Sequence, residues 1–116
     1  ADGNFPVMSM GKNAQIIRMD GHGVPEILDA ILRVFPLDTY IEKPVNLMEV
    51  MPGDDVQTPI WDVYKKTVEK YDERGKNAIG EIERFKFYEE TKTAYAVIAT
   101  SEKALYANIM LQKGVV

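Results

Sequence analysis

The 116-residue chain contains no cysteine and only one histidine, and both shortages exclude whole classes of site. Without cysteine there is no disulfide, no zinc ribbon, no thiol nucleophile and no thiolate-bound iron–sulfur cluster. His22 alone leaves little room for a multi-histidine metal site. The formal net charge of −4 argues against nucleic acid as a partner, because nucleic-acid binders usually present a basic face.

Long hydrophobic runs and common catalytic motifs are also missing. No apolar stretch approaches the ~20 residues of a membrane helix, so we expect no membrane partner. The chain opens without a charged segment followed by an apolar one, and we therefore expect no signal peptide and a cytoplasmic location. It has no Walker loop, no GxGxxG and no GxSxG, so nucleotide binding and serine hydrolysis lack motif support.

What is present is typical of one small α/β domain spanning residues 1–116. The hydrophobic content of 46 % is sufficient for a core. Apolar spacing predicts one helix over 24–35, with Pro25 in its first turn. It predicts a second helix from Pro59 to Tyr71, with Thr58 as its N-cap and Gly75 ending it. Strand-like segments are expected at 15–18, 45–50, 81–87, 94–100 and 108–111, with 94–100 buried on both faces. Strands alternating with helices indicate a layered α/β architecture.

Three residues near turns are candidates for chemistry, each with an ordinary alternative. His22 lies between glycines and titrates near neutrality, which suits proton transfer, but a structural turn is the favoured interpretation. Asp2 and Asp20 each stand where a strand meets a turn, the place where open α/β sheets bind ligands. An aspartate before such a turn is equally common without a ligand, and both interpretations stay open.

Two later segments carry groups that suit a polar small molecule. Arg84 lies among aromatic residues, so the forked donors of its guanidinium and the flat faces of the aromatic rings could together hold a sugar. An arginine that covers the edge of the core is an equally good interpretation. Tyr106 and Asn108 place a phenol and an amide beside a strand, where turn and packing roles are the alternative. Trp61 is expected in the core.

Several segments together resemble the family of monosaccharide mutarotases and pyranases. The stretch 84–89 reads Arg-Phe-Lys-Phe-Tyr-Glu, and its arginine favours the L-fucose branch, because the ribose branch carries histidine there. Ala107 departs from the glycine that many L-fucose members have between Tyr and Asn. The other matching segments occur in the family's order and cover nearly the whole chain: 1–6, 17–21, 36–40, 57–61 and 104–115.

The resemblance implies a three-layer α/β/α sandwich with a mixed sheet and a cofactor-free, metal-free isomerase. It implies interconversion of the α and β anomers of L-fucose and related aldoses by a homo-oligomeric ring of ten or fewer copies, with sites near subunit interfaces. The positions that match family sugar-binding residues are Asp2, Arg84, Tyr106, Ala107 and Asn108. Of these, Tyr106 could also relay a proton as a catalytic group.

The family's proton donor is the histidine of a Gly-His-Gly-Asp motif, and this role is not assigned to His22. Val24 stands where that motif has its aspartate, and the motif belongs upstream of the segment that matches 1–6. We therefore expect an N-terminal helix and most of a first strand to precede Ala1 in the complete protein. A ribose pyranase and a non-catalytic monosaccharide-binding protein remain the alternatives.

Overall fold

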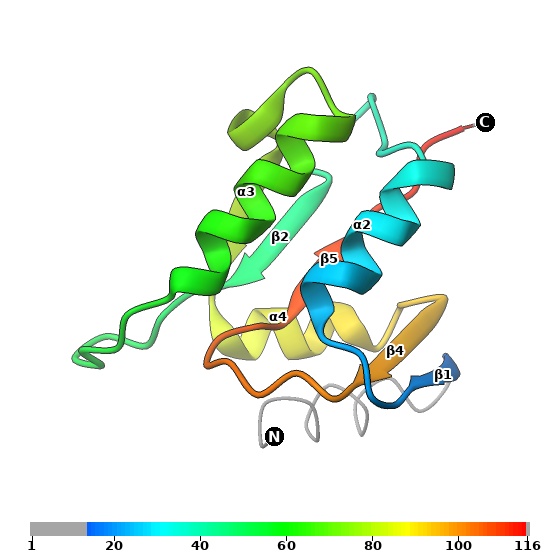
Figure 1. Ribbon diagram of the computed structural model, residues 1–116. Coiled ribbons are helices and arrows are strands. Elements are labelled where there is room, and N and C mark those ends of the chain that lie inside the picture. Colours follow the sequence, from blue (N-terminus) through cyan, green and yellow to red (C-terminus); the bar gives the residue numbers. More distant parts are fainter. Residues whose placement is uncertain (1–13, 116) are drawn as a thin grey trace.

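The computed structural model describes residues 14–115, which form an α/β fold (Figure 1). The elements in chain order are β1 (Gln15–Met19), α2 (Val24–Val34), β2 (Val45–Met48), α3 (Pro59–Tyr71), the 3₁₀ turn η1 (Gly75–Ala78), β3 (Ile79–Ile82), α4 (Arg84–Thr91), β4 (Ala96–Thr100) and β5 (Ile109–Leu111). The two helices expected from apolar spacing are thus confirmed, each with proline in its first turn.

The described strands form two sheets. In the three-stranded sheet β2 is central, parallel to β3 and antiparallel to β5. β1 and β4 pair in parallel as a separate two-stranded sheet. The α/β class and the mixed sheet expected from the sequence are confirmed.

The main core lies between the three-stranded sheet and the helices α2 and α3. Figure 1 shows α3 lying along β2 with α2 beside it. The apolar stripe of α3 is buried as its spacing predicts, with Tyr64 and Val68 completely inaccessible. The cluster consists of Leu28, Leu32, Leu37, Val45, Leu47, Ile60, Tyr64, Val68 and Ala78.

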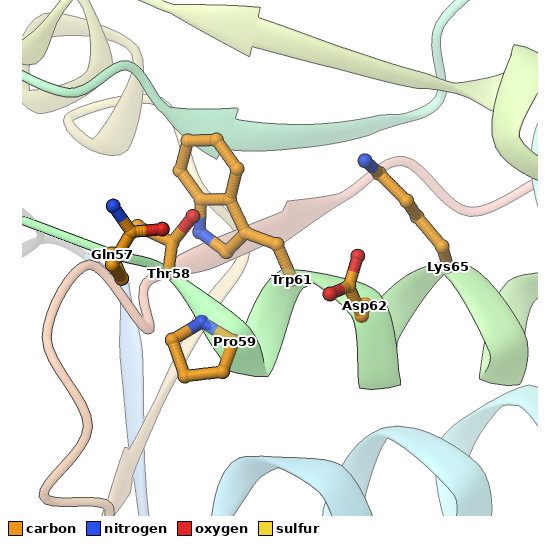
Figure 2. Close-up of a pocket in the computed structure, with 6 residues that line it drawn as sticks. All are labelled: Gln57, Thr58, Pro59, Trp61, Asp62 and Lys65. Atoms are coloured by element: carbon orange, nitrogen blue, oxygen red, sulfur yellow. The ribbon is translucent and has the colours of Figure 1, made fainter.

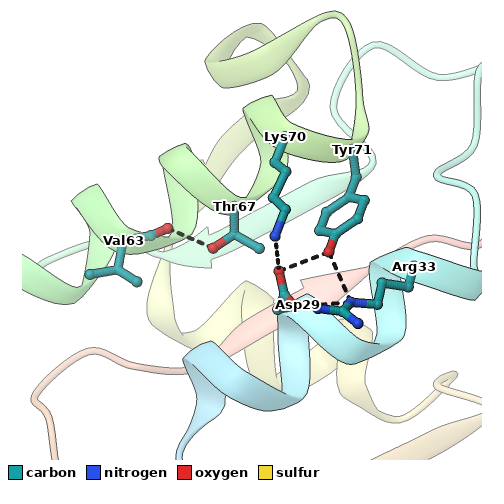
Figure 3. Close-up of polar contacts among 6 residues, drawn as sticks. All are labelled: Asp29, Arg33, Val63, Thr67, Lys70 and Tyr71. Atoms are coloured by element: carbon teal, nitrogen blue, oxygen red, sulfur yellow. Dashed lines mark hydrogen bonds and ion pairs between the residues drawn. The ribbon is translucent and has the colours of Figure 1, made fainter.

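A polar cluster joins α2 to α3 at the edge of this core (Figure 3). The Asp29 carboxylate accepts hydrogen bonds from the Tyr71 hydroxyl at 2.9 Å and the Lys70 ammonium at 3.2 Å. Arg33 donates from one helical turn away to the other oxygen of Asp29. The hydrogen bond from Tyr71 and then that from Lys70 lower the pKa of Asp29, because both favour its ionised form.

The expected strand over 81–87 is wrong in its second half. β3 ends at Ile82, and the helix α4 begins at Arg84. The Glu83 carboxylate accepts hydrogen bonds from the backbone N–H groups of Phe85 and Lys86, and it thereby caps the first turn of α4. Arg84 consequently sits at the start of a helix rather than along a strand.

Three smaller expectations also need correction. The Thr58 side chain makes no capping hydrogen bond to α3. Gly75 does adopt the left-handed region, with φ of 56°, but it follows the helix end at Asp72 and opens η1. β4 alternates between buried and half-buried positions, so only one face of this strand is fully buried rather than both.

Candidate functional site

The site is built around Tyr106, whose backbone has an unusual conformation. Its φ of 54° lies in the left-handed region, which non-glycine residues rarely enter. Two side chains of α3 hold this segment in place. The Trp61 indole N–H donates to the carbonyl oxygen of Tyr106 at 2.8 Å, and the Tyr64 hydroxyl donates to that of Ala107 at 2.7 Å. These bonds compensate for the local strain and fix where the Tyr106 side chain begins.

Three groups from distant segments meet at the Tyr106 hydroxyl. It donates to Asp54 Oδ2 at 2.8 Å and accepts from the Met51 backbone N–H at 3.3 Å. Arg84 Nη2 lies 3.5 Å from the same oxygen, and the guanidinium carbon lies 5.7 Å from the centre of the phenol ring. A carboxylate, a phenol and a guanidinium are therefore adjacent, although 52 residues separate Asp54 from Tyr106 and 22 separate Arg84 from it.

Arg84 contributes an unusual donor to this cluster. Its Nε is buried and has no hydrogen-bond partner among residues 14–115. Buried guanidinium N–H groups are nearly always paired, since an unpaired one loses its hydration without compensation. An oxygen-rich ligand beside Tyr106 would supply the missing acceptor, and the forked geometry of arginine suits adjacent oxygens.

A hollow of about 270 Å³ opens at the N-terminal end of α3 (Figure 2). Figure 2 shows Trp61 and Lys65 rising from the same side of the helix, with Thr58 near the indole ring. Trp61 connects this hollow to the Tyr106 cluster through its hydrogen bond to the Tyr106 backbone. The lining combines one aromatic ring with hydrogen-bonding groups: Gln57, Thr58, Pro59, Trp61, Asp62 and Lys65.

The structure brings together most of the residues that the sequence singled out as sugar-binding. Tyr106, Ala107 and Asn108 are consecutive and half-buried immediately before β5, and Arg84 reaches Tyr106 from α4. Asp2 lies outside the described residues.

The two remaining candidates make local contacts near the start of α2. Asp20 pairs with the exposed Arg18. His22 Nδ1 lies 2.7 Å from Glu26 Oε1 one turn along the chain, and both side chains are more than half exposed. The favoured interpretation of His22 as a structural turn residue fits this contact.

Sequence reasoning missed two residues of the cluster. The sequence does not single out Asp54, and it predicts Trp61 only as a core residue, although the Asp54 carboxylate contacts the Tyr106 hydroxyl and the Trp61 indole N–H holds the backbone of Tyr106. The Pro52-Gly53 pair is typical of a tight turn, but nothing in the sequence indicates which side chain such a turn faces.

The chemistry available at the cluster is hydrogen bonding and proton transfer. Residues 14–115 contain no group of three or more His, Asp or Glu side chains that could hold a metal ion. The same residues include no helix with the length and apolar character needed to cross a membrane. Phenol, guanidinium and amide groups in a half-buried setting suit a neutral, hydroxyl-rich molecule.

Comparisons with known proteins agree with this chemistry. The chain is 45% identical over 119 residues to the human fucose mutarotase, an alignment that covers 99% of the chain and 76% of that relative. The crystal structure of FucU from Bifidobacterium longum is 65% identical, with a TM-score of 0.94, and covers 98% of this chain and 80% of its own. The fucose mutarotase from Streptococcus pneumoniae, solved with L-fucose, is 44% identical with a TM-score of 0.82 over 88% of this chain and 71% of its own.

A family model covers the chain along its whole length. The model of the RbsD / FucU transport protein family matches residues 1–116, which include the segments that carry Arg84 and Tyr106. Together with the level of identity to the human relative, this match settles membership. The chain belongs to the RbsD / FucU transport protein family.

Proposed function

We propose that the protein is an L-fucose mutarotase, an isomerase that interconverts the α and β anomers of the sugar. The observation that carries the proposal is the similarity to fucose mutarotases at 45% and 44% identity, the second solved with L-fucose, combined with an intact Tyr106 and Arg84 cluster. D-ribose pyranase activity is the same-class alternative, and the arginine at position 84 favours L-fucose over it.

The reaction needs an acid and a base on opposite sides of one carbon–oxygen bond. An acid protonates the ring oxygen while a base removes the proton from the anomeric hydroxyl, and the bond between C1 and the ring oxygen breaks. The open aldehyde rotates about its C1–C2 bond. Attack by the former ring oxygen, which is now a hydroxyl, on the other face of C1, with the two proton transfers reversed, gives the second anomer.

Each site residue has a role in this scheme. Arg84 holds a ring or hydroxyl oxygen, and its unpartnered Nε supports that assignment. Tyr106 contacts the reacting hydroxyl and takes part in the proton transfer. Asn108 and Asp2 bind further hydroxyl groups, while the small side chain of Ala107 leaves room for the ring.

The remaining features of the proposal concern the protein as a whole. Residues 1–116 form one mutarotase-like domain that acts in the cytoplasm without a cofactor. The protein assembles as a homo-oligomeric ring whose sites lie near the subunit interfaces. Sedimentation of the purified protein, with and without L-fucose, tests the assembly.

Saturation-transfer NMR on L-fucose tests the activity directly. Saturating one anomeric proton signal should reduce the other much more in the presence of catalytic amounts of the protein than in buffer. Arg84→Ala should lose sugar affinity, whereas Lys86→Ala, which removes an exposed cation from the same helix, should behave as wild type. Binding of L-fucose without faster exchange would identify a non-catalytic binding protein instead, and faster pyranose–furanose exchange of D-ribose alone would identify a pyranase.

A further inference from the structure

We propose that Asp54 is a positioning residue for the mutarotase reaction. Its carboxylate holds the proton of the Tyr106 hydroxyl away from the sugar, so that the phenolic oxygen faces the sugar as a hydrogen-bond acceptor. The inference rests on the proposed function and adds to it the direction of the hydrogen bond between protein and substrate.

The direction follows from the chemistry of the contact. An ionised carboxylate has only acceptor atoms, so the 2.8 Å contact between Asp54 Oδ2 and the Tyr106 oxygen requires the phenol to donate. A phenol has one proton, and this contact uses it. The backbone N–H of Met51 donates to the same oxygen at 3.3 Å. Any further partner of this oxygen must therefore also be a donor; Arg84 Nη2 approaches it at 3.5 Å, and a sugar hydroxyl would take the place of that long contact.

A single tight turn supplies both contacts. The Asp54 backbone N–H donates to the Met51 carbonyl oxygen at 3.0 Å, which closes a four-residue turn over Met51, Pro52, Gly53 and Asp54. A type II turn requires the positive φ that Gly53 has at the third position, 83°, and it favours proline at the second. The turn thereby presents one backbone donor and one carboxylate acceptor to the same phenolic oxygen. Proline also reduces the conformational freedom of the unfolded turn, which favours this arrangement.

The consequence concerns which proton moves. In anomer interconversion the anomeric hydroxyl must give up its proton, and an acceptor atom has to face it. With its own proton directed at Asp54, the Tyr106 oxygen accepts from that hydroxyl, and as it takes the hydroxyl proton the phenolic proton passes to the Asp54 carboxylate. Without Asp54 the phenolic proton is free to turn toward the sugar, and the resulting hydrogen bond points in the unproductive direction.

The test compares substitutions at Asp54 with a matched change at its neighbour. Asp54→Asn keeps the size of the side chain but offers both a donor and an acceptor, so it no longer fixes the phenolic proton. We expect the kcat for L-fucose anomer exchange to fall about tenfold, with KM within about twofold of wild type, which is the loss expected for a charge-assisted hydrogen bond. Asp54→Glu should recover part of that kcat, because it restores a carboxylate. Asp55→Asn removes the same charge from the next exposed residue and should leave kcat unchanged.

Several results would overturn the positioning role. These are an Asp54→Asn variant as fast as wild type, an Asp55→Asn variant as slow as Asp54→Asn, or an Asp54→Glu variant no faster than Asp54→Asn. Circular dichroism should show all variants folded, since the turn is exposed. A wild-type protein that does not accelerate exchange would refute the proposed function itself, whereas an active wild type with an unaffected Asp54→Asn variant would refute only the role of Asp54.

Discussion

Replacing Tyr64 by phenylalanine tests how the core supports the candidate site. The Tyr64 ring is completely buried in the main core, and its hydroxyl donates to the Ala107 carbonyl at 2.7 Å. Phenylalanine keeps the ring and its packing but leaves that half-buried carbonyl without its donor. A neutral hydrogen bond is worth about 1 kcal/mol net, and the stranded carbonyl raises the expected loss to about 1–2 kcal/mol.

The effect should depend on pH in a defined direction. Burial, followed by the negative charge of Glu102, raises the pKa of the Tyr64 hydroxyl above its ordinary value of 10.0. Below that value the hydroxyl is protonated in both the folded and the unfolded chain, so its contribution is fully present. Above it the unfolded chain releases the proton and the folded chain retains it, so wild type should lose about 1.4 kcal/mol of stability per pH unit from this group. Tyr64→Phe lacks the group, and its deficit should therefore shrink at alkaline pH.

Urea unfolding of both proteins at neutral pH and again above pH 10 provides the measurement. At neutral pH the melting temperature of Tyr64→Phe should also fall by roughly 4 °C for each kcal/mol lost. The denaturant slope should stay constant, because the surface exposed on unfolding hardly changes. Tyr95→Phe, at a side chain that is 88% exposed, serves as the control and should leave stability unaltered. A Tyr64→Phe variant as stable as wild type at neutral pH, or a deficit that grows with pH, would refute the reasoning.

Three further predictions follow from other contacts. Asp29→Asn should destabilise the protein at neutral pH. Because the pKa of Asp29 is lowered in the folded chain, the stability that its carboxylate contributes should be lost as the pH falls below the ordinary aspartate value of 3.8, and the difference in stability from wild type should diminish. Equal differences in urea midpoint at pH 7 and pH 3 would contradict this. Gly75→Ala should lower the free energy of unfolding by about 1–2 kcal/mol, since alanine is strained at φ of 56° and its Cβ would lie 2.9 Å from Glu69 Cγ. Urea unfolding measures this loss, and an unchanged urea midpoint would show that the turn relaxes freely. Glu83→Ala should lower the free energy of unfolding by about 0.5–2 kcal/mol, because it removes the cap of α4. It should also slow L-fucose anomer exchange, because α4 begins with Arg84 of the site. Glu83→Asp should preserve both stability and exchange better than Glu83→Ala.

The helices of the fold could be predicted because their signals are local. Apolar residues three and four apart, with proline in the first turn, indicated α2 and α3 and the buried positions Tyr64 and Val68. The start of α4 could not be predicted in this way, because 81–87 alternates weakly in hydrophobicity. The capping of Phe85 and Lys86 by Glu83 decides between helix and strand there.

The sequence by itself determined the α/β class, the main helices, the absence of thiol chemistry and, through its ordered motifs, the family. It also identified Arg84 and Tyr106 as residues that could bind a sugar. Their meeting at one hydroxyl group, together with Asp54, was decided only by the tertiary structure. Such contacts join segments 22 and 52 residues apart and depend on a left-handed Tyr106, which Trp61 and Tyr64 stabilise from α3. No local pattern encodes that conformation, because the free energy that maintains it comes from hydrogen bonds formed only after the helices have packed on the sheet.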